Sequence, residues 1–259
     1  MQRIILSILL VTLAFALQGQ HTLDQQALNQ VDSQGRKTGP WKVEYPNGKT
    51  LYEATFSEGL PVGEMIRYYD NGAVRARLMF DTLEDRSYAR LFYVSGKQAA
   101  EGWYLSQEKD SVWTYYSEFD GSVRIREPYE KGLLNGTVFS YYSGGEVSEE
   151  VNWDMQRKQG DWKQYYSNGA TRLHSFYRDD LLHGSYKIFY ADGTLKISGE
   201  YLDNQSHGTW SYFDESGEEI YSLEYLSGRP VDQKKYNEWI QDSLSKYEVI
   251  AEPESDQQF

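Results

Sequence analysis

The sequence YLDNQSHGTWSYFDESG, residues 201–217, is one full copy of a motif that recurs along most of this chain. Tyr201 is followed seven residues later by Gly208, and a run rich in aromatic residues then ends at a second glycine, Gly217. Eight copies fit this template. A supersecondary unit repeated in tandem buries its apolar surface against its neighbours, so these copies decide the architecture.

The spacing of the copies is regular. The second glycine recurs every 24 residues, with one interval of 25 in the fourth copy, where residues 117–121 gain one residue. An aromatic residue lies eight residues after it in every copy, and a glycine or serine lies nine residues before it, or ten in the fourth copy. We interpret both of these small residues as turn positions. The second glycines are Gly48, Gly72, Gly96, Gly121, Gly145, Gly169, Gly193 and Gly217; the earlier residues are Gly39, Gly63, Ser87, Ser111, Gly136, Gly160, Gly184 and Gly208; the aromatic residues are Phe56, Phe80, Tyr104, Tyr129, Trp153, Tyr177, Tyr201 and Tyr225.

Each copy contains two runs with the length and composition of β-strands. The runs are about six to eight residues long, which suits a strand better than a helix. They alternate apolar residues, as in Trp41, Val43 and Tyr45, and they are rich in types that favour a pleated surface. Asn-Gly or Asp-Gly often lies between the two runs, and this is a strong hairpin signal because both residues tolerate a positive φ. The sequence predicts an all-β, elongated single-domain repeat of about eight tandem β-hairpins over residues 35–229.

The aromatic residues predict how the hairpins hold together. A single hairpin is marginally stable in water, so we expect neighbouring hairpins to bury one another's aromatic rows. Sixteen strands about 4.8 Å apart would form a body about 75 Å long. Adjacent residues of a strand face opposite sides, so each pair of aromatic neighbours should place one ring on each face. These pairs are Tyr68-Tyr69, Phe92-Tyr93, Tyr115-Tyr116, Tyr141-Tyr142, Tyr165-Tyr166 and Phe189-Tyr190.

These features resemble MORN-type repeats, most closely the bacterial MORN-variant form. The best matches are residues 177–184, YRDDLLHG, and residues 201–210, YLDNQSHGTW. The resemblance covers residues 35 to about 228 and weakens in the third and fourth copies, where Ser87 and Ser111 replace the glycine. It implies a hairpin-repeat scaffold that engages other proteins or sometimes lipid. Bacterial chains of this kind are often labelled antitoxin-like by association, and the resemblance implies no catalytic residues.

Residues 1–20 have the pattern of a secretory signal peptide. Arg3 precedes a mostly apolar run of about 14 residues, which ends near the small residues Ala14 and Ala16. The alternative is a retained N-terminal anchor, although this run is short for a membrane span. We expect cleavage between Ala16 and His21 and export to a bacterial periplasm or to the exterior, with no transmembrane segment in the mature chain.

Charge and cysteine content exclude several classes of function. The chain has no cysteine, which excludes disulfides, thiolate catalysis, cysteine metal sites and lipid attachment at a lipobox. Export without cysteine favours a bacterial source. The net charge is −13, and no basic stripe that nucleic acid would require is present. An acidic chain is also repelled by anionic lipid surfaces.

The segments outside the repeats predict three further parts. Residues 21–34 form a polar lead-in, which we expect to be a loose cover for the first hairpin. Residues 230–248 predict an amphipathic helix that begins near Asp232 and caps the exposed end of the eighth hairpin. Residues 249–259 form an acidic tail with the composition of disordered segments. The apolar positions of the helix are Tyr236, Trp239, Ile240, Leu244 and Tyr247.

No catalytic, cofactor-binding or metal site is predicted. His183 and His207 occupy a repeat position that holds unrelated residues in the other copies, and His174 is alone in a second strand. The adjacent carboxylates Asp179-Asp180 and Glu149-Glu150 should face opposite sides of a strand, so we interpret them as solvated charges. Gly144-Gly145 is a hairpin turn without the Lys-Ser/Thr of a phosphate loop, and no cofactor is expected.

Four tryptophans of the first strands, Trp41, Trp113, Trp162 and Trp210, allow two interpretations. The first is packing between repeats. The second is an exposed row of rings that stacks on sugars, as in cell-wall-binding repeat modules. Trp103, Trp153 and Trp239 lie elsewhere and are interpreted as structural.

Three functions are consistent with the sequence. The leading hypothesis is an exported, non-enzymatic scaffold at the cell envelope, whose partner is a protein with a basic or apolar segment. The second is a module that binds carbohydrate or peptidoglycan. The third is an enzyme with a site built from tyrosines and carboxylates, and the absence of a convergent catalytic motif argues against it.

Overall fold

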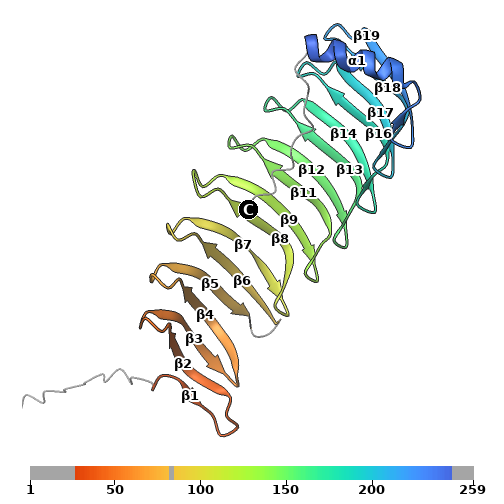
Figure 1. Ribbon diagram of the computed structural model, residues 1–259. Helices are drawn as coiled ribbons and strands as arrows, with labels where there is room; N and C mark the ends of the chain where they lie inside the picture. Colours follow the sequence, from red (N-terminus) through yellow and green to blue (C-terminus); the bar gives the residue numbers. More distant parts are fainter. Residues whose placement is uncertain (1–26, 82–84, 247–259) are drawn as a thin grey trace, which may run out of the picture.

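The structure, a computed structural model, describes residues 27–81 and 85–246, so the predicted signal peptide and acidic tail lie outside the described residues. The described chain forms one antiparallel sheet, in which strands pair with their neighbours in sequence, followed by one helix (Figure 1). The strands are β1 Gln30–Val31, β2 Lys37–Glu44, β3 Thr50–Ser57, β4 Leu60–Tyr68, β5 Val74–Asp81, β6 Arg86–Phe92, β7 Gln98–Leu105, β8 Glu108–Tyr116, β9 Val123–Glu130, β10 Leu133–Leu134, β11 Gly136–Tyr141, β12 Val147–Asp154, β13 Arg157–Tyr165, β14 Thr171–Arg178, β15 Leu181–Leu182, β16 Gly184–Phe189, β17 Leu195–Leu202, β18 Gln205–Phe213, β19 Glu219–Leu226 and β20 Arg229–Pro230; the helix is α1 Gln233–Lys246.

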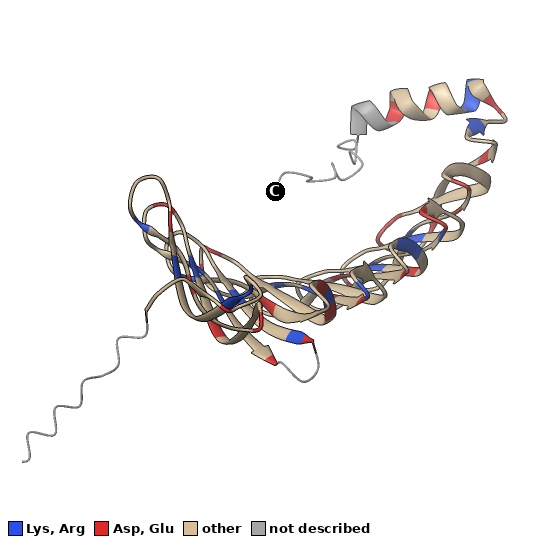
Figure 2. Cartoon of the chain, turned by 90° about the horizontal axis from the view of Figure 1, so that it is seen from below, with Lys and Arg blue, Asp and Glu red and all other residues tan. Residues whose placement is uncertain are grey.

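The predicted all-β fold of tandem hairpins is confirmed. Each copy of the motif supplies two long strands joined by a hairpin turn, and a connecting turn joins it to the next copy. The short strands β10 and β15 continue into β11 and β16 after interruptions at Asn135 and His183. Basic and acidic residues are interspersed along the bent sheet, as Figure 2 shows.

The hairpin turns lie where the sequence predicts them, but only their glycine has a positive φ. In the first turn the Tyr45 N–H donates to the Lys49 carbonyl and the Gly48 N–H donates to the Tyr45 carbonyl. Gly48 has φ 80°, whereas Asn47 is not in the positive region. Asn47 instead accepts a hydrogen bond at Oδ1 from the Lys49 N–H at 3.0 Å. This pattern is a type I turn closed by a glycine bulge, so asparagine is favoured here for its side-chain acceptor.

The earlier glycine of each copy is not a turn residue, which corrects the prediction. The connecting turn lies a few residues before it, as at Asp203 and Asn204, whose φ values of 51° and 66° suit a type I′ turn. Gly208 itself lies inside β18 with φ 64°, where the pairing of β17 with β18 shifts register. A positive φ is required at such a β-bulge as well as in a turn. Ser111 takes this conformation in the fourth copy, with φ 58°.

The third copy departs from this rule. Ser87 is buried and has no positive φ, and the pairing of β5 with β6 runs without a register shift. The bulge is therefore absent in this copy. Here serine replaces the glycine, as it does in the fourth copy, but β5 and β6 are also separated by four residues, 82–85.

The two faces of the sheet have different roles. One face, called here the aromatic face, carries Trp41, Trp113, Trp162 and Trp210 together with the aromatic residues that follow each hairpin turn. Cross-strand pairs such as Trp41 with Ala54 and Gly39 with Phe56 place them on the same side. The opposite side is called the polar face. Every buried side chain of the described residues lies on the aromatic face: Ala54, Phe56, Ala76, Ser87, Ala89, Ala100, Trp113, Leu134, Val151, Leu173, Ser175, Trp210 and Leu223.

Tyrosine hydroxyls link neighbouring repeats beside the hairpin turns. In six of the seven junctions between repeats, a tyrosine donates its O–H to a backbone carbonyl 23 residues further along the chain, at 2.6–2.9 Å. The junction between the fourth and fifth repeats lacks this bond because Ser117 replaces the tyrosine. The donors are Tyr45, Tyr69, Tyr93, Tyr142, Tyr166 and Tyr190.

We expect Tyr166→Phe to lower the free energy of unfolding by about 1 kcal/mol, because it removes the hydroxyl donor to the Phe189 carbonyl and leaves that acceptor without its partner. Urea denaturation followed by circular dichroism measures this loss. Tyr141→Phe is the matched control, since the Tyr141 hydroxyl meets only the Arg126 guanidinium at 3.5 Å. An equal loss in both variants would contradict a specific role for the Tyr166 bond.

The ends of the sheet are covered by the segments that flank the repeats. At the first end, β1 pairs with β2, and the Trp41 indole N–H donates to the Gln30 carbonyl at 3.0 Å. At the other end, Asp232 caps α1 by accepting the Lys235 N–H at 2.9 Å, and Trp239 stacks on Tyr221 at 5.3 Å. The predicted helix therefore forms on the eighth hairpin, but Trp239 packs on Tyr212 and Tyr221 of its aromatic face rather than on the open edge of β19. Of the predicted apolar positions, Tyr247 lies outside the described residues.

Candidate interaction surface

The tryptophan row is mainly a packing device. Trp113 and Trp210 are 0% and 6% exposed, and their rings lie flat over the backbone of Gly102 and Gly199. A Cβ atom at Gly102 would lie 2.5 Å from the Trp113 ring. The indole of Trp113 also donates to the Trp103 carbonyl at 2.8 Å. These two rings cannot stack on a sugar, so the four tryptophans do not form the exposed row that the carbohydrate hypothesis requires.

The remaining tryptophans also have partners within the chain. Trp41 and Trp162 are half-buried, and the Trp162 indole donates to the Glu149 carboxylate at 2.8 Å. On the polar face, the Arg86 guanidinium lies over the Trp103 ring at 3.9 Å. Trp153 is half-buried on the aromatic face, and Trp239 packs α1 on the last hairpin as described above. The predicted structural role of these last three residues is consistent with their contacts.

Lysine side chains of the protein lie over the aromatic face. The Lys37 ammonium is 4.5 Å from the centroid of the Trp41 ring and 4.8 Å from that of Phe56, and it donates to the Tyr52 hydroxyl at 2.9 Å. Lys158 lies 4.9 Å from the ring of Tyr177. A cation above a ring face is attracted by the ring quadrupole.

The fourth repeat has the most enclosed of these arrangements. The Lys109 ammonium lies 4.7–5.2 Å from the centroids of Trp113, Tyr115 and Tyr129, and it donates to the two tyrosine hydroxyls. Burial lowers the pKa of Lys109, and it raises the pKa of Tyr129 to about 12. Glu127 accepts the Tyr129 hydroxyl at 2.7 Å and supplies a negative charge beside the ammonium. The aromatic face can therefore hold an ammonium group between rings.

Sequence reasoning missed these lysines. The available signal was their shared position at the start of the first strand of a repeat, just before the bulge residue, in copies one, four and six. Without the register of the bulge, their side chains could not be assigned to the aromatic face.

The three histidines of the described residues are separate from one another, and none of them belongs to a convergent site. His174 Nε2 lies 2.7 Å from the Asp161 carboxylate, and His183 Nδ1 lies 3.2 Å from Asp203. His207 follows the next connecting turn and has a buried Nδ1 without a hydrogen-bond partner. Within residues 27–81 and 85–246, no group of three or more histidines and carboxylates could hold a metal ion.

The carboxylate pairs form no acid/base couple. Asp179 and Asp180 are the two central residues of a connecting turn; Asp179 meets Arg157 at 3.1 Å, and Asp180 accepts the Lys158 N–H. Glu149 accepts the Trp162 indole N–H on the aromatic face, while the adjacent Glu150 projects to the other side. Gly144-Gly145 forms a hairpin turn, in which Gly145 has φ 96°.

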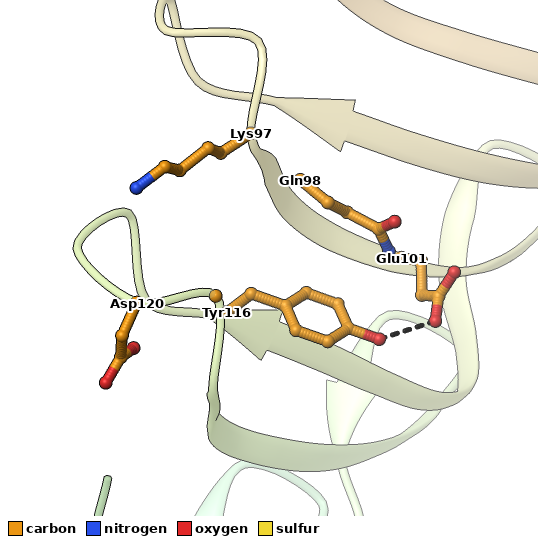
Figure 3. Close-up of a pocket in the computed structure, with 6 residues that line it drawn as sticks. Lys97, Gln98, Glu101, Tyr116 and Asp120 are labelled. Atoms are coloured by element: carbon orange, nitrogen blue, oxygen red, sulfur yellow. Dashed lines mark hydrogen bonds between the residues drawn. The ribbon is translucent and has the colours of Figure 1, made fainter.

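A shallow cavity of about 420 Å³ lies on the polar face beside the fourth hairpin turn (Figure 3). Tyr116 donates to Glu101 across it at 2.6 Å, and this bond lowers the pKa of the Glu101 carboxyl. Hydrogen bonds from Ser122 lower the pKa of Asp120 to about 2, so both carboxylates are ionised at neutral pH. Lys97 also lines the cavity and donates to the carbonyls of Glu118 and Phe119 in the turn. These groups are occupied in fixing the turn and offer no nucleophile with an adjacent base.

Comparison with known proteins supports the repeat assignment. The family described as MORN repeat variant matches residues 37–58 and residues 182–203. These segments are the first and the seventh repeats, and each contains one complete hairpin: β2 with β3, and β16 with β17. Modules of this type are in general non-catalytic scaffolds for protein interaction. No curated protein matches the chain. Among the described residues, no helix has the length and apolar character needed to cross a membrane.

Proposed function

We propose that this chain is an exported, non-enzymatic scaffold that binds a protein partner on its aromatic face at the cell envelope. Export rests on the pattern of residues 1–20, with Arg3 before a short apolar run. The partner presents a basic segment with apolar residues, which suits a chain of net charge −13.

The observation that carries this proposal is the set of lysines held over aromatic rings. Lys37, Lys109 and Lys158 each lie within 5 Å of the centroid of at least one ring of the aromatic face. The protein therefore already binds ammonium groups on this surface, in three of its eight repeats. At the repeats that lack such a lysine, a basic partner segment would place its own cations over the aromatic rings. The tyrosines of this face would supply apolar contact area and would lose little side-chain entropy on binding.

Site-specific photo-crosslinking in cells tests the binding surface. A photoreactive residue at Ile188, which is half-buried on the aromatic face, is expected to capture one reproducible protein through a basic or apolar segment identified by mass spectrometry. The matched control is the adjacent residue Lys187, which is exposed on the polar face. Equal capture from both positions, or no protein from either, would refute binding through the aromatic face.

The same experiment distinguishes a protein partner from the carbohydrate partner of the second hypothesis. If the partner is a glycan, the crosslinked product from Ile188 carries muropeptide or sugar mass in place of a peptide.

Export is tested on the mature protein purified from the producing cell, whose first residue is expected between Leu17 and His21. A chain that starts at Met1 and fractionates with the cytoplasm would refute export.

A further inference from the structure

One long edge of the sheet carries a regular row of exposed leucines. At each connecting turn, the last residue of one strand pairs with the first residue of the next strand, and both point to the polar face because they follow or precede residues of the aromatic face. In six of the eight connections one member of this pair, and only one, is leucine. These residues, called here the leucine edge, are Leu60, Leu105, Leu133, Leu181, Leu202 and Leu226.

The two remaining connections have methionine nearby. The second connection pairs Asp81 with Arg86, and Met79 lies two residues earlier on the same face. The fifth pairs Asp154 with Arg157, and Met155 lies in the turn between them. Both methionines are about half exposed. An exposed apolar side chain is thus found at or beside every connection along this edge.

No described segment covers these side chains. The six leucines are 38–68% exposed, and they recur with the pitch of one repeat, about 9.6 Å, over about 67 Å. The other long edge, formed by the hairpin turns, is mostly polar, with Val94, Phe119 and Ile220 as its exposed apolar residues. A row of exposed leucines confined to one edge indicates an interaction surface rather than the scattered apolar residues normal on protein surfaces.

The spacing and the charges of the leucine edge indicate which partner binds there. A partner must present apolar groups every 9.6 Å or so over the same length, and a second copy of this chain has that spacing. Among the six pairs that contain leucine, the charged members are acidic in the first half of the edge, at Glu108 and Glu130, and basic in the second half, at Arg178 and Arg229. The second and fifth pairs each join an aspartate to an arginine. Two copies in antiparallel orientation therefore match in charge, whereas parallel copies would place each carboxylate against itself.

We propose that two copies of this chain associate side by side through the leucine edge, in antiparallel orientation about a two-fold axis. This register places the third connection opposite the sixth, so Glu108 meets Arg178 and Leu105 meets Leu181. It also places the fourth connection opposite the fifth, with Glu130 opposite Arg157 and Leu133 opposite Asp154. Both arginines already contact aspartates of their own chain, Arg178 with Asp203 at 2.9 Å and Arg157 with Asp179 at 3.1 Å, and both remain more than half exposed and accessible to a second carboxylate. A self-complementary contact of this kind closes as a dimer and does not extend into a filament.

Sedimentation velocity on the full chain tests the association. The wild-type protein is expected to sediment with the mass of two chains, and Leu105→Ser combined with Leu181→Ser is expected to shift it to one. Because these side chains are 42% and 38% exposed, the variant should keep its circular dichroism spectrum and thermal midpoint. Val94→Ser combined with Phe119→Ser, on the opposite edge, is the matched control and should remain a dimer. A wild-type protein with the mass of one chain at all concentrations, or dissociation by the control alone, would overturn the proposal.

Cysteine crosslinking tests the register. The chain has no cysteine, so Leu105→Cys and Leu181→Cys each introduce the only thiol. An oxidised mixture of the two variants should give a disulfide-linked dimer. Each variant alone should not, because the two copies of residue 105 lie three repeats apart, about 29 Å, far beyond the reach of a disulfide. Crosslinking of Leu105→Cys with itself, with no mixed disulfide between positions 105 and 181 in the mixture, would establish a parallel contact and refute this arrangement.

Discussion

Trp113→Ala is expected to lower the free energy of unfolding by about 3–5 kcal/mol, which is the usual cost of truncating a buried tryptophan. Trp113 is the largest fully buried side chain of the described residues, and it has no exposed surface. Its ring meets Tyr104 edge to face at 4.9 Å and covers Gly102. Alanine would expose the backbone at Gly102 and leave Lys109 with fewer rings around its ammonium group.

The shift of the urea midpoint, followed by circular dichroism, measures this effect. Phe119→Ala is the control, because Phe119 lies in the same repeat but is 91% exposed. Substitutions at such exposed positions usually change stability by less than about 0.5 kcal/mol. A similar small change for Trp113→Ala would show that the ring does not form part of the core.

Gly199→Val is expected to destabilise the junction between the seventh and eighth repeats by about 1–3 kcal/mol through overpacking. A Cβ atom at this position would lie 2.3 Å from Cδ2 of Trp210. The indole cannot move aside easily, because Tyr201 and Tyr186 meet it at 5.1 and 5.5 Å. Gly199 has no positive φ, so the cost is steric and not conformational. Thermal and urea unfolding of the purified variant measure it.

A double-mutant cycle identifies the clash as the cause. Gly199→Val should cost less in a Trp210→Ala background, since the ring that collides with the new side chain is gone, and a coupling above about 1 kcal/mol is expected between two residues in direct contact. Ser198→Val, one residue earlier on the polar face, is the matched control and should be close to neutral. Additive effects of the two core substitutions would show that the glycine is required for another reason.

The fold followed from the sequence because its signals repeat. The spacing of Gly193 and Gly217, with aromatic residues at fixed offsets, predicted the hairpins, and residues 232–248 changed period where the helix begins. The conformation at the earlier glycine could not be predicted in the same way. A positive φ serves a turn and a β-bulge equally well, and only the pairing register distinguishes them. Gly208 lies in a bulge for this reason, while the turn is made by Asp203 and Asn204.

The core was predictable in outline and not in detail. The alternation of Trp41, Val43 and Tyr45 indicated a packed face, but it did not show which rings would be fully buried. The signal lay in the neighbouring strand: Gly102 and Gly199 leave room above the backbone that the indoles of Trp113 and Trp210 fill. Recognising this pairing requires the bulge register, since an error of one residue moves the glycine to the other face.

The candidate surfaces were less accessible to sequence reasoning. The lysines over the aromatic face and the leucine edge both occupy positions beside the connecting turns, which the sequence placed incorrectly. Once those turns are located, Leu202 and Leu226 occupy equivalent corners of successive repeats. Their exposure, however, depends on whether another segment covers the edge, and only the three-dimensional arrangement answers that question.

The missing tyrosine at Ser117 gives the molecule a mechanical weak point. Each strand holds only its neighbours, so tension applied at the two ends is carried through every junction in series. Three hydroxyl–carbonyl bonds lie on each side of the junction between the fourth and fifth hairpins and none lies across it, so the first rupture under load is expected there. The stretched molecule would then separate into two blocks of four hairpins, and each block would retain its three hydroxyl–carbonyl hydrogen bonds.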